Sequence, residues 1–139
     1  LGSQAEQCKS LFPFPIYPMN YVSNEKELVD IYNAVDLYVT PSLQDNLPNT
    51  IVEAMACGIP CVGFNVGGIP QMIDHLHNGY VAQYKSADDL ANGICWTLTE
   101  GDYETLSSEA YRKAVTTYSE ATVASQYIQI YNHITGKNA

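Results

Sequence analysis

Two carboxylates, Asp45 and Glu53, lie eight positions apart on either side of a turn and could grip a ligand rich in hydroxyl groups. Residues 36–40 predict a buried strand, and residues 48–57 predict a helix that Gly58 closes. A carboxylate accepts hydrogen bonds from two neighbouring hydroxyls, such as the diol of a ribose. The order of these groups suits a nucleotide sugar. The acid in the loop would bind the sugar, the N-terminus of the helix would bind the phosphates, and the acid in the helix would bind the ribose.

The start of this helix is the expected phosphate site. Pro48 suits the first helical position, because the N–H group that proline lacks has no helical partner there. The N–H groups of Asn49, Thr50 and Ile51 would then point back toward the loop and favour an anion. Spacing alone leaves a second explanation equally open, in which the two acids are a helix cap and a solvated surface group.

Strands and helices alternate along the chain. Apolar runs predict strands within residues 16–22, 36–40, 61–65 and 80–84. The strands are continuously apolar rather than alternating, which favours an open, mostly parallel sheet covered by helices on both faces. We therefore expect a Rossmann-like α/β fold. Ligands of such sheets bind beyond the carboxyl ends of the strands, where the turns at 41–48 and 65–70 both lie.

The helices that follow the strands have apolar stripes and capping residues. Asn24 or Ser23 is expected to cap one helix and Ser86 another, because an acidic residue follows Asn24 and Ser86 three positions later. Stripes at helical spacing are formed by Ala87, Leu90, Ala91, Ile94 and Leu98, by Tyr103, Leu106, Ala110, Ala114 and Tyr118, and by Val123, Tyr127, Ile130 and Ile134.

The composition excludes several classes of protein. The 139 residues carry a net charge of −9 with only six basic side chains, which disfavours binding to nucleic acid or to anionic membranes. No apolar run approaches the length of about 20 residues that a membrane span needs. The four cysteines lack the spacing of a zinc site, so we expect small buried side chains in a reducing cytosol and no metal.

Several ordered motifs occur together between about residue 21 and residue 98. They are Leu28-Val29-Asp30-Ile31-Tyr32-Asn33-Ala34-Val35-Asp36, Pro41-Ser42, Asp45, Glu53-Ala54-Met55-Ala56-Cys57-Gly58-Ile59-Pro60, Gly67-Gly68-Ile69-Pro70, Asn78-Gly79-Tyr80-Val81 and Asp89-Leu90-Ala91. This stretch resembles the donor-binding C-terminal domain of retaining glycosyltransferases of the GT-B fold, family 4, also called glycosyl transferases group 1.

The resemblance implies a role for each site residue. Asp45 takes the place of a glutamate that contacts donor-sugar hydroxyls, and Glu53 that of a glutamate that binds the nucleotide ribose; these are the expected catalytic residues. The expected substrate-binding residues are Val22, at the nucleobase, and Asn46, Leu47, Pro48, Asn49 and Thr50, around sugar and phosphates. Asp45 is shorter than the usual glutamate, which leaves the identity of the donor sugar open.

The resemblance also implies a mechanism and a larger protein. In this family the sugar is transferred with retention, and the leaving diphosphate helps to deprotonate the acceptor, so no cofactor and no metal are expected. The family's phosphate-neutralising arginine and lysine would precede Leu1. We therefore expect a single nucleotide-sugar-binding domain over residues 1–139 that is N-terminally incomplete and inactive alone. Residues 119–135 are expected to return, as a closing helix, toward an N-terminal domain that binds the acceptor, a glycan or polysaccharide precursor.

Further expectations and alternatives remain at this point. The missing strands would leave the strand at 36–40 with an unpaired edge, which predicts dimerisation or strand exchange there. The expected location is the cytoplasm, with peripheral membrane association of the full-length enzyme left open. A non-catalytic, flavodoxin-like interaction or regulatory module would also explain the alternation and the acidic charge, although not the acid pair. An epimerase of similar fold fits the motifs less well.

Overall fold

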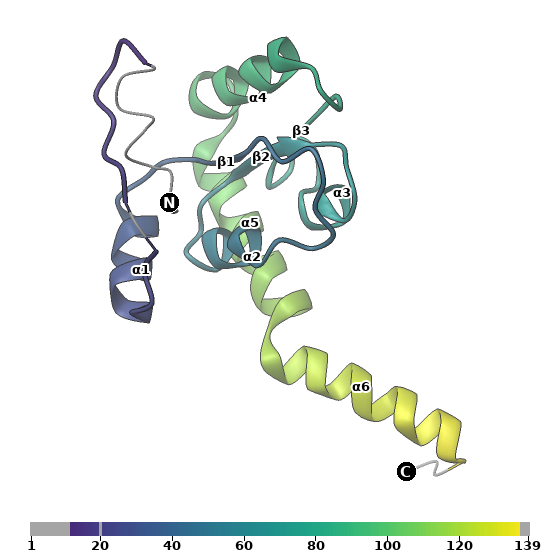
Figure 1. The fold of residues 1–139 in the computed structure, drawn as a ribbon. Coiled ribbons are helices and arrows are strands. Elements are labelled where there is room, and N and C mark those ends of the chain that lie inside the picture. Colours follow the sequence, from purple (N-terminus) through teal and green to yellow (C-terminus); the bar gives the residue numbers. More distant parts are fainter. Residues whose placement is uncertain (1–11, 20, 137–139) are drawn as a thin grey trace. The chain divides into compact units, whose positions relative to one another are not determined.

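A computed structural model describes residues 12–19 and 21–136 of the chain (Figure 1). The chain divides into two compact units, Leu1–Ala34 and Val35–Ala139. The longer unit contains the sheet and all but the first of the described helices. In the described residues, no helix is long and apolar enough to cross a membrane.

The first unit contains helix α1, Glu25–Asn33. Asn24 caps it as expected, since its side chain accepts a hydrogen bond of 3.2 Å from the N–H of Glu27. The strand expected within residues 16–22 is wrong, because the described part of this segment has no strand structure. Pro15 and Pro18 give the physical reason, since neither has an N–H group to donate to a sheet.

The second unit is built on three parallel strands in the order β1-β2-β3, as Figure 1 shows. Their bounds are Tyr38–Thr40, Cys61–Phe64 and Gly79–Ala82. Every residue of the central strand β2 is buried. The parallel sheet confirms the fold class expected from the sequence. Strand β1 begins two residues later than residue 36, where the apolar pattern placed it.

Helices flank this sheet. They are α2, Asn49–Ala56; α3, Ile69–Met72; α4, Ala87–Thr99; α5, Tyr103–Tyr118; and α6, Glu120–Thr135. Figure 1 shows α4 above the sheet and α2 and α5 below it. The expected stripe of α5 is buried at Leu106, Ala110 and Ala114, and α5 packs against α2. The largest fully buried side chains include Ile51, Met55, Val62, Ile69, Met72 and Ile73.

Helix α4 packs through a face that is shifted from the expected one, with Leu90 and Ile94 of the expected stripe only half-buried. Ser86 caps it as predicted, accepting a hydrogen bond of 3.2 Å from the N–H of Asp89. The fully buried positions, however, are Gly93 and Thr97, whereas Leu98 of the expected stripe is 50% exposed. A Cβ atom at Gly93 would overlap the ring of Tyr80. The ring of Tyr80, a residue of β3, thus occupies the space that a side chain at position 93 of α4 would need.

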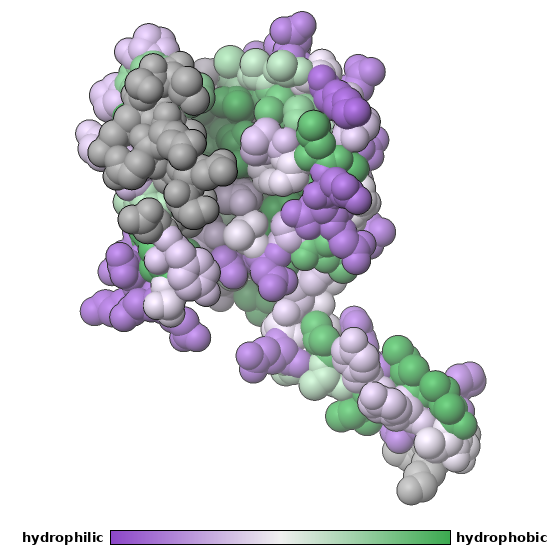
Figure 2. All heavy atoms as spheres, viewed as in Figure 1, coloured by the Kyte–Doolittle hydropathy of each residue, from purple (hydrophilic) through white to green (hydrophobic). Residues whose placement is uncertain are grey.

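Helix α6 contains no buried residue. Of its expected stripe only Val123 is half-buried, and Tyr127, Ile130 and Ile134 are 55–74% exposed. Ser119 separates α6 from α5, with an extended backbone and a side chain that accepts from the N–H of Thr122 at 3.3 Å. Figure 1 shows α6 leading away from the sheet, and Figure 2 shows hydrophobic side chains along it.

Candidate functional site

The two turns that the sequence singled out press against each other at the carboxyl ends of β1 and β2. A Cβ atom at Gly67 would overlap the carbonyl oxygen of Asp45, and one at Gly68 would overlap that of Asn46. At Gly68 it would also lie 2.8 Å from a terminal carbon of Leu47. The loop that carries Asp45 therefore packs directly against the backbone of Gly67 and Gly68, where a residue with a side chain would not fit.

The same loop is tied to the end of the third strand. The hydroxyl of Tyr84, just beyond β3, donates a hydrogen bond of 3.1 Å to the carbonyl oxygen of Leu43. The hydroxyl of Thr40, at the end of β1, donates to the Ser42 hydroxyl at 3.2 Å. The loop at 41–48, which follows β1, thus contacts the segments that follow β2 and β3, as expected for the ligand-binding edge of a parallel sheet.

The start of α2 differs by one residue from the expectation. Pro48 is the N-cap rather than the first helical residue, with an extended ψ of 116°. Its carbonyl oxygen accepts a hydrogen bond of 3.0 Å from the N–H of Ile51. The expectation that the N–H group of Ile51 is free to bind an anion is therefore wrong. The phosphate prediction depends on the first two helical residues, Asn49 and Thr50.

Glu53 lies in the second turn of α2 and lines a cavity of about 380 Å³. The cavity is lined by Leu47, Asn49, Val52, Glu53, Met72, Tyr118 and Val123. It therefore brings three sequence-predicted residues, Leu47, Asn49 and Glu53, together with residues from α3, α5 and α6.

The remaining predicted residues lie elsewhere. Asp45, Asn46, Pro48 and Thr50 belong to the loop and the helix start beside the cavity but are not among its lining residues. Asp45 is half-buried and Asn46 is exposed. Val22 is half-buried and belongs to the unit of residues 1–34.

Tyr38 is a residue of this site that the sequence did not single out. Its hydroxyl donates a hydrogen bond of 2.8 Å to the Thr50 hydroxyl, at the start of α2. Burial raises the pKa of Tyr38, the bond to Thr50 opposes that rise, and the charges of Glu53 and Asp45 add to it. The hydroxyl of Tyr38 is thus close enough to Asp45 and Glu53 for both carboxylates to affect its pKa. In the sequence Tyr38 is one residue of an apolar strand, and nothing there indicates that its hydroxyl contacts the start of α2.

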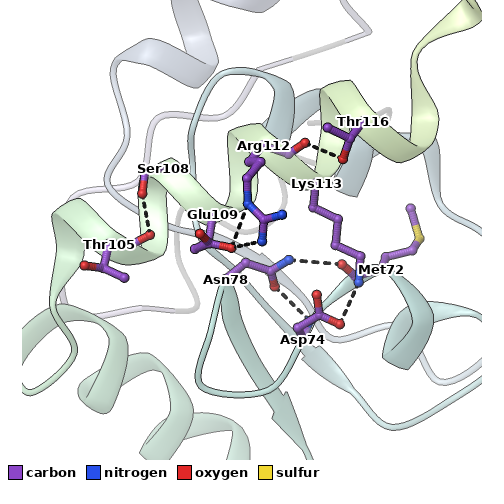
Figure 3. Close-up of polar contacts among 9 residues, drawn as sticks. All are labelled: Met72, Asp74, Asn78, Thr105, Ser108, Glu109, Arg112, Lys113 and Thr116. Atoms are coloured by element: carbon purple, nitrogen blue, oxygen red, sulfur yellow. Dashed lines mark hydrogen bonds and ion pairs between the residues drawn. The ribbon is translucent and has the colours of Figure 1, made fainter. Parts of the chain in front are cut away.

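A polar cluster holds the chain after Met72 against α5 (Figure 3). Lys113 of α5 forms an ion pair of 2.7 Å with Asp74. The buried side chain of Asn78 accepts from the N–H of Asp74 at 2.8 Å and donates to the carbonyl oxygen of Met72 at 3.4 Å. Glu109 pairs with Arg112 on the same helix. These contacts fix Met72, one wall of the cavity, relative to α5.

The cysteines and metal ligands of the described residues give no second site. Cys61 is buried, and burial raises the pKa of its thiol far above the ordinary value. Cys57 is half-buried, but Cys95 is exposed on α4, so the expectation of buried cysteines is wrong for Cys95. Cys8 lies outside the described residues. Within them, no three histidine, cysteine or acidic side chains gather as a metal site would require.

Known proteins resemble this chain in sequence. The family model for glycosyl transferases group 1 matches residues 4–100. N-acetyl-alpha-D-glucosaminyl L-malate synthase of Bacillus anthracis is 28% identical over 112 residues, which are 80% of this chain and 29% of that protein. D-inositol 3-phosphate glycosyltransferase of Rhodococcus jostii is 33% identical over 88 residues, 63% of this chain and 20% of that protein. The chain spans about a fifth to a third of the length of the curated relatives it matches.

Solved structures share its fold. Anabaena HepE in complex with UDP and glucose has a TM-score of 0.76 at 23% identity, over 92% of this chain and 35% of that one. Sucrose-phosphate synthase of Thermosynechococcus elongatus has a TM-score of 0.75 at 24% identity, over 86% and 30% of the two chains. The parallel sheet with flanking helices matches GT-B glycosyltransferase domains. Since the family model covers well over half of its residues, the chain belongs to the glycosyl transferases group 1 family.

Proposed function

We propose that this chain binds the nucleotide-sugar donor of a retaining glycosyltransferase at the carboxyl edge of its sheet. Glu53 accepts hydrogen bonds from the ribose diol, and Asp45 accepts from donor-sugar hydroxyls. The start of α2, between them, receives the phosphates. The observation that carries the proposal is the cavity at Glu53, beside a loop packed onto Gly67 and Gly68.

Complexes of structural neighbours support the choice of ligand class. HepE has been solved with UDP and with UDP-glucose, and the pneumococcal O-GlcNAc transferase GtfA with UDP and GlcNAc. These proteins are 23–24% identical to this chain. Their likeness establishes the fold, so the ligand has to be tested on this chain's own residues. UDP and GDP are the natural first probes.

In the whole protein, we propose transfer of the sugar to a glycan or polysaccharide precursor with retention at the anomeric carbon. The residues of this chain bind and orient the donor, and an N-terminal acceptor domain completes the site. Cationic side chains of the whole protein neutralise the leaving diphosphate, so that neither metal nor cofactor takes part. The exposed apolar residues of α6, Tyr127, Ile130 and Ile134, supply a surface for that further domain. The chain alone is inactive.

Titration of the chain with UDP and with GDP, followed by amide NMR, tests donor binding. Residues 45–53 are expected to show the largest chemical-shift changes, because the loop and the start of α2 surround the phosphates. Adenine nucleotides, titrated in parallel, control for general anion binding. Shifts that avoid residues 45–53, or none with either UDP or GDP, would contradict the proposal and favour the flavodoxin-like interaction module.

We further propose that the chain dimerises through β1. This strand is at one edge of the sheet that the described residues form, with β2 on its other side. An edge strand presents N–H and C=O groups that can pair with a second chain. Light scattering coupled to size-exclusion chromatography is expected to give twice the mass of 15.3 kDa. If the chain remains a monodisperse monomer at a concentration of about 100 µM, any dimer has a dissociation constant above about that value, and the proposed dimer is excluded.

The proposed location is the cytoplasm. Cys57, Cys61 and Cys95 are all free thiols, as is usual in a reducing compartment. Peripheral membrane association of the whole enzyme would have to involve surfaces other than the acidic ones of this chain, whose net charge is −9.

A further inference from the structure

The cavity beside Glu53 has a lining that suits an uncharged ring better than a phosphate. Its lining contains the apolar side chains Leu47, Val52, Met72 and Val123, and none of the described residues that line it is a lysine, arginine or histidine. A diphosphate placed there would lie beside the Glu53 carboxylate without a counter-charge, at a large desolvation cost. The volume of about 380 Å³ is at the small end of ligand sites, which span about 300–1,000 Å³. One nucleoside is the part of the donor that this space and lining fit.

Of the lining residues in the described part of the chain, Tyr118 alone is aromatic. It is the last residue of α5 and half-buried. Its hydroxyl donates a hydrogen bond of 3.3 Å to the carbonyl oxygen of Gln71, next to Met72 in α3. That bond anchors the far end of the side chain, so the ring is held at the cavity wall in one orientation.

The helix that carries Tyr118 is itself fixed to the same segment. The ion pair between Lys113 and Asp74 joins α5 to the chain just after α3. Asn78, fully buried, holds Asp74 and Met72 through its amide. Figure 3 shows these contacts side by side. The wall formed by Tyr118 and Met72 is therefore in place before a ligand arrives, which lowers the entropic cost of binding.

We propose that Tyr118 is a further binding residue of the donor site, against whose ring the nucleoside of the donor stacks while Glu53 holds the ribose diol. This inference rests on the proposed function. It adds a residue 65 positions beyond Glu53 to the site. It also assigns the cavity to the nucleoside and leaves the diphosphate at the start of α2.

The ring contact can be separated from the hydroxyl by two substitutions. Tyr118→Leu removes the aromatic face and is expected to weaken UDP binding about tenfold, as loss of one stacking contact does. Tyr118→Phe keeps the face but frees the ring from Gln71, and about a threefold loss is expected. Tyr111→Leu is the matched control, because Tyr111 is on the same helix and 54% exposed. It should bind UDP as the original chain does.

The deciding experiment is calorimetry of these variants with UDP, together with intermolecular NOEs between tyrosine ring protons and the nucleoside of bound UDP. The expected result is the graded loss above and NOEs that disappear in Tyr118→Leu. Melting curves establish that each variant is folded. If the original chain binds UDP but Tyr118→Leu binds it equally well, without NOEs to Tyr118, this inference is wrong and the donor site stands. If the original chain binds neither UDP nor GDP, the proposed function fails and the inference with it.

Discussion

Replacing Glu53 by glutamine is expected to weaken binding of UDP by about 10- to 100-fold. Glutamine has nearly the same size but offers one acceptor oxygen instead of two, and its amide places N–H donors before the donor hydroxyls of a ribose. Hydrogen bonds that involve a charged partner contribute about 1.5–3 kcal/mol, which corresponds to that range of affinity. Calorimetric titration of the chain with UDP measures the effect directly.

A ribose-specific role of Glu53 can be separated from a general effect of charge. Glu100→Gln removes the same charge at an exposed position just after α4, and its affinity for UDP should be unchanged. UDP that lacks the 2′-hydroxyl should bind the original chain more weakly and should lose little further affinity in Glu53→Gln. Unchanged UDP affinity in Glu53→Gln would remove Glu53 from the ribose site.

The local part of the site could be predicted from the sequence. The turn after β1, the helix with Glu53 and the Gly67-Gly68 turn are each encoded within a few residues, and parallel strands place their turns at one edge. The predicted start of α2 differs from the observed start by one residue, because Pro48 is the N-cap and Asn49 the first helical residue. The fixed φ of proline suits an N-cap as well as a first helical residue, so composition does not distinguish the two.

The long-range part of the site could not be predicted. Tyr118 and Val123 belong to apolar stripes in the sequence, and a stripe does not indicate whether its members pack in a core, line a cavity or face solvent. The packed face of α4 is shifted from the expected one for a related reason, since its packing depends on the fit between Gly93 of the helix and the Tyr80 ring of β3. The segment at 16–22 has strand-like side chains, but Pro18 within it and Pro15 before it have no N–H group with which to pair.

Replacing Gly68 by alanine is expected to destabilise the chain by about 3 kcal/mol or more and to abolish measurable UDP binding. Gly68 has a φ of −90°, which any residue adopts, so backbone strain plays no part. The added Cβ would instead overlap the carbonyl oxygen of Asn46 and lie 2.8 Å from Leu47. Gly68 is buried, and the closest contact of the added Cβ is a backbone atom of the loop, so the loop itself would have to shift.

Denaturant unfolding measures the first effect and calorimetry with UDP the second. Gly136→Ala is the control, since a Cβ atom at Gly136 would meet nothing within 4 Å, although the φ of this residue is 65°. It should cost about 1 kcal/mol, from the left-handed backbone alone, and leave UDP binding intact. If Gly68→Ala retained full stability, the loop that carries Asp45 would not rest on this turn. If stability fell but UDP still bound with the original affinity, the packing would hold and the loop would not be part of the donor site.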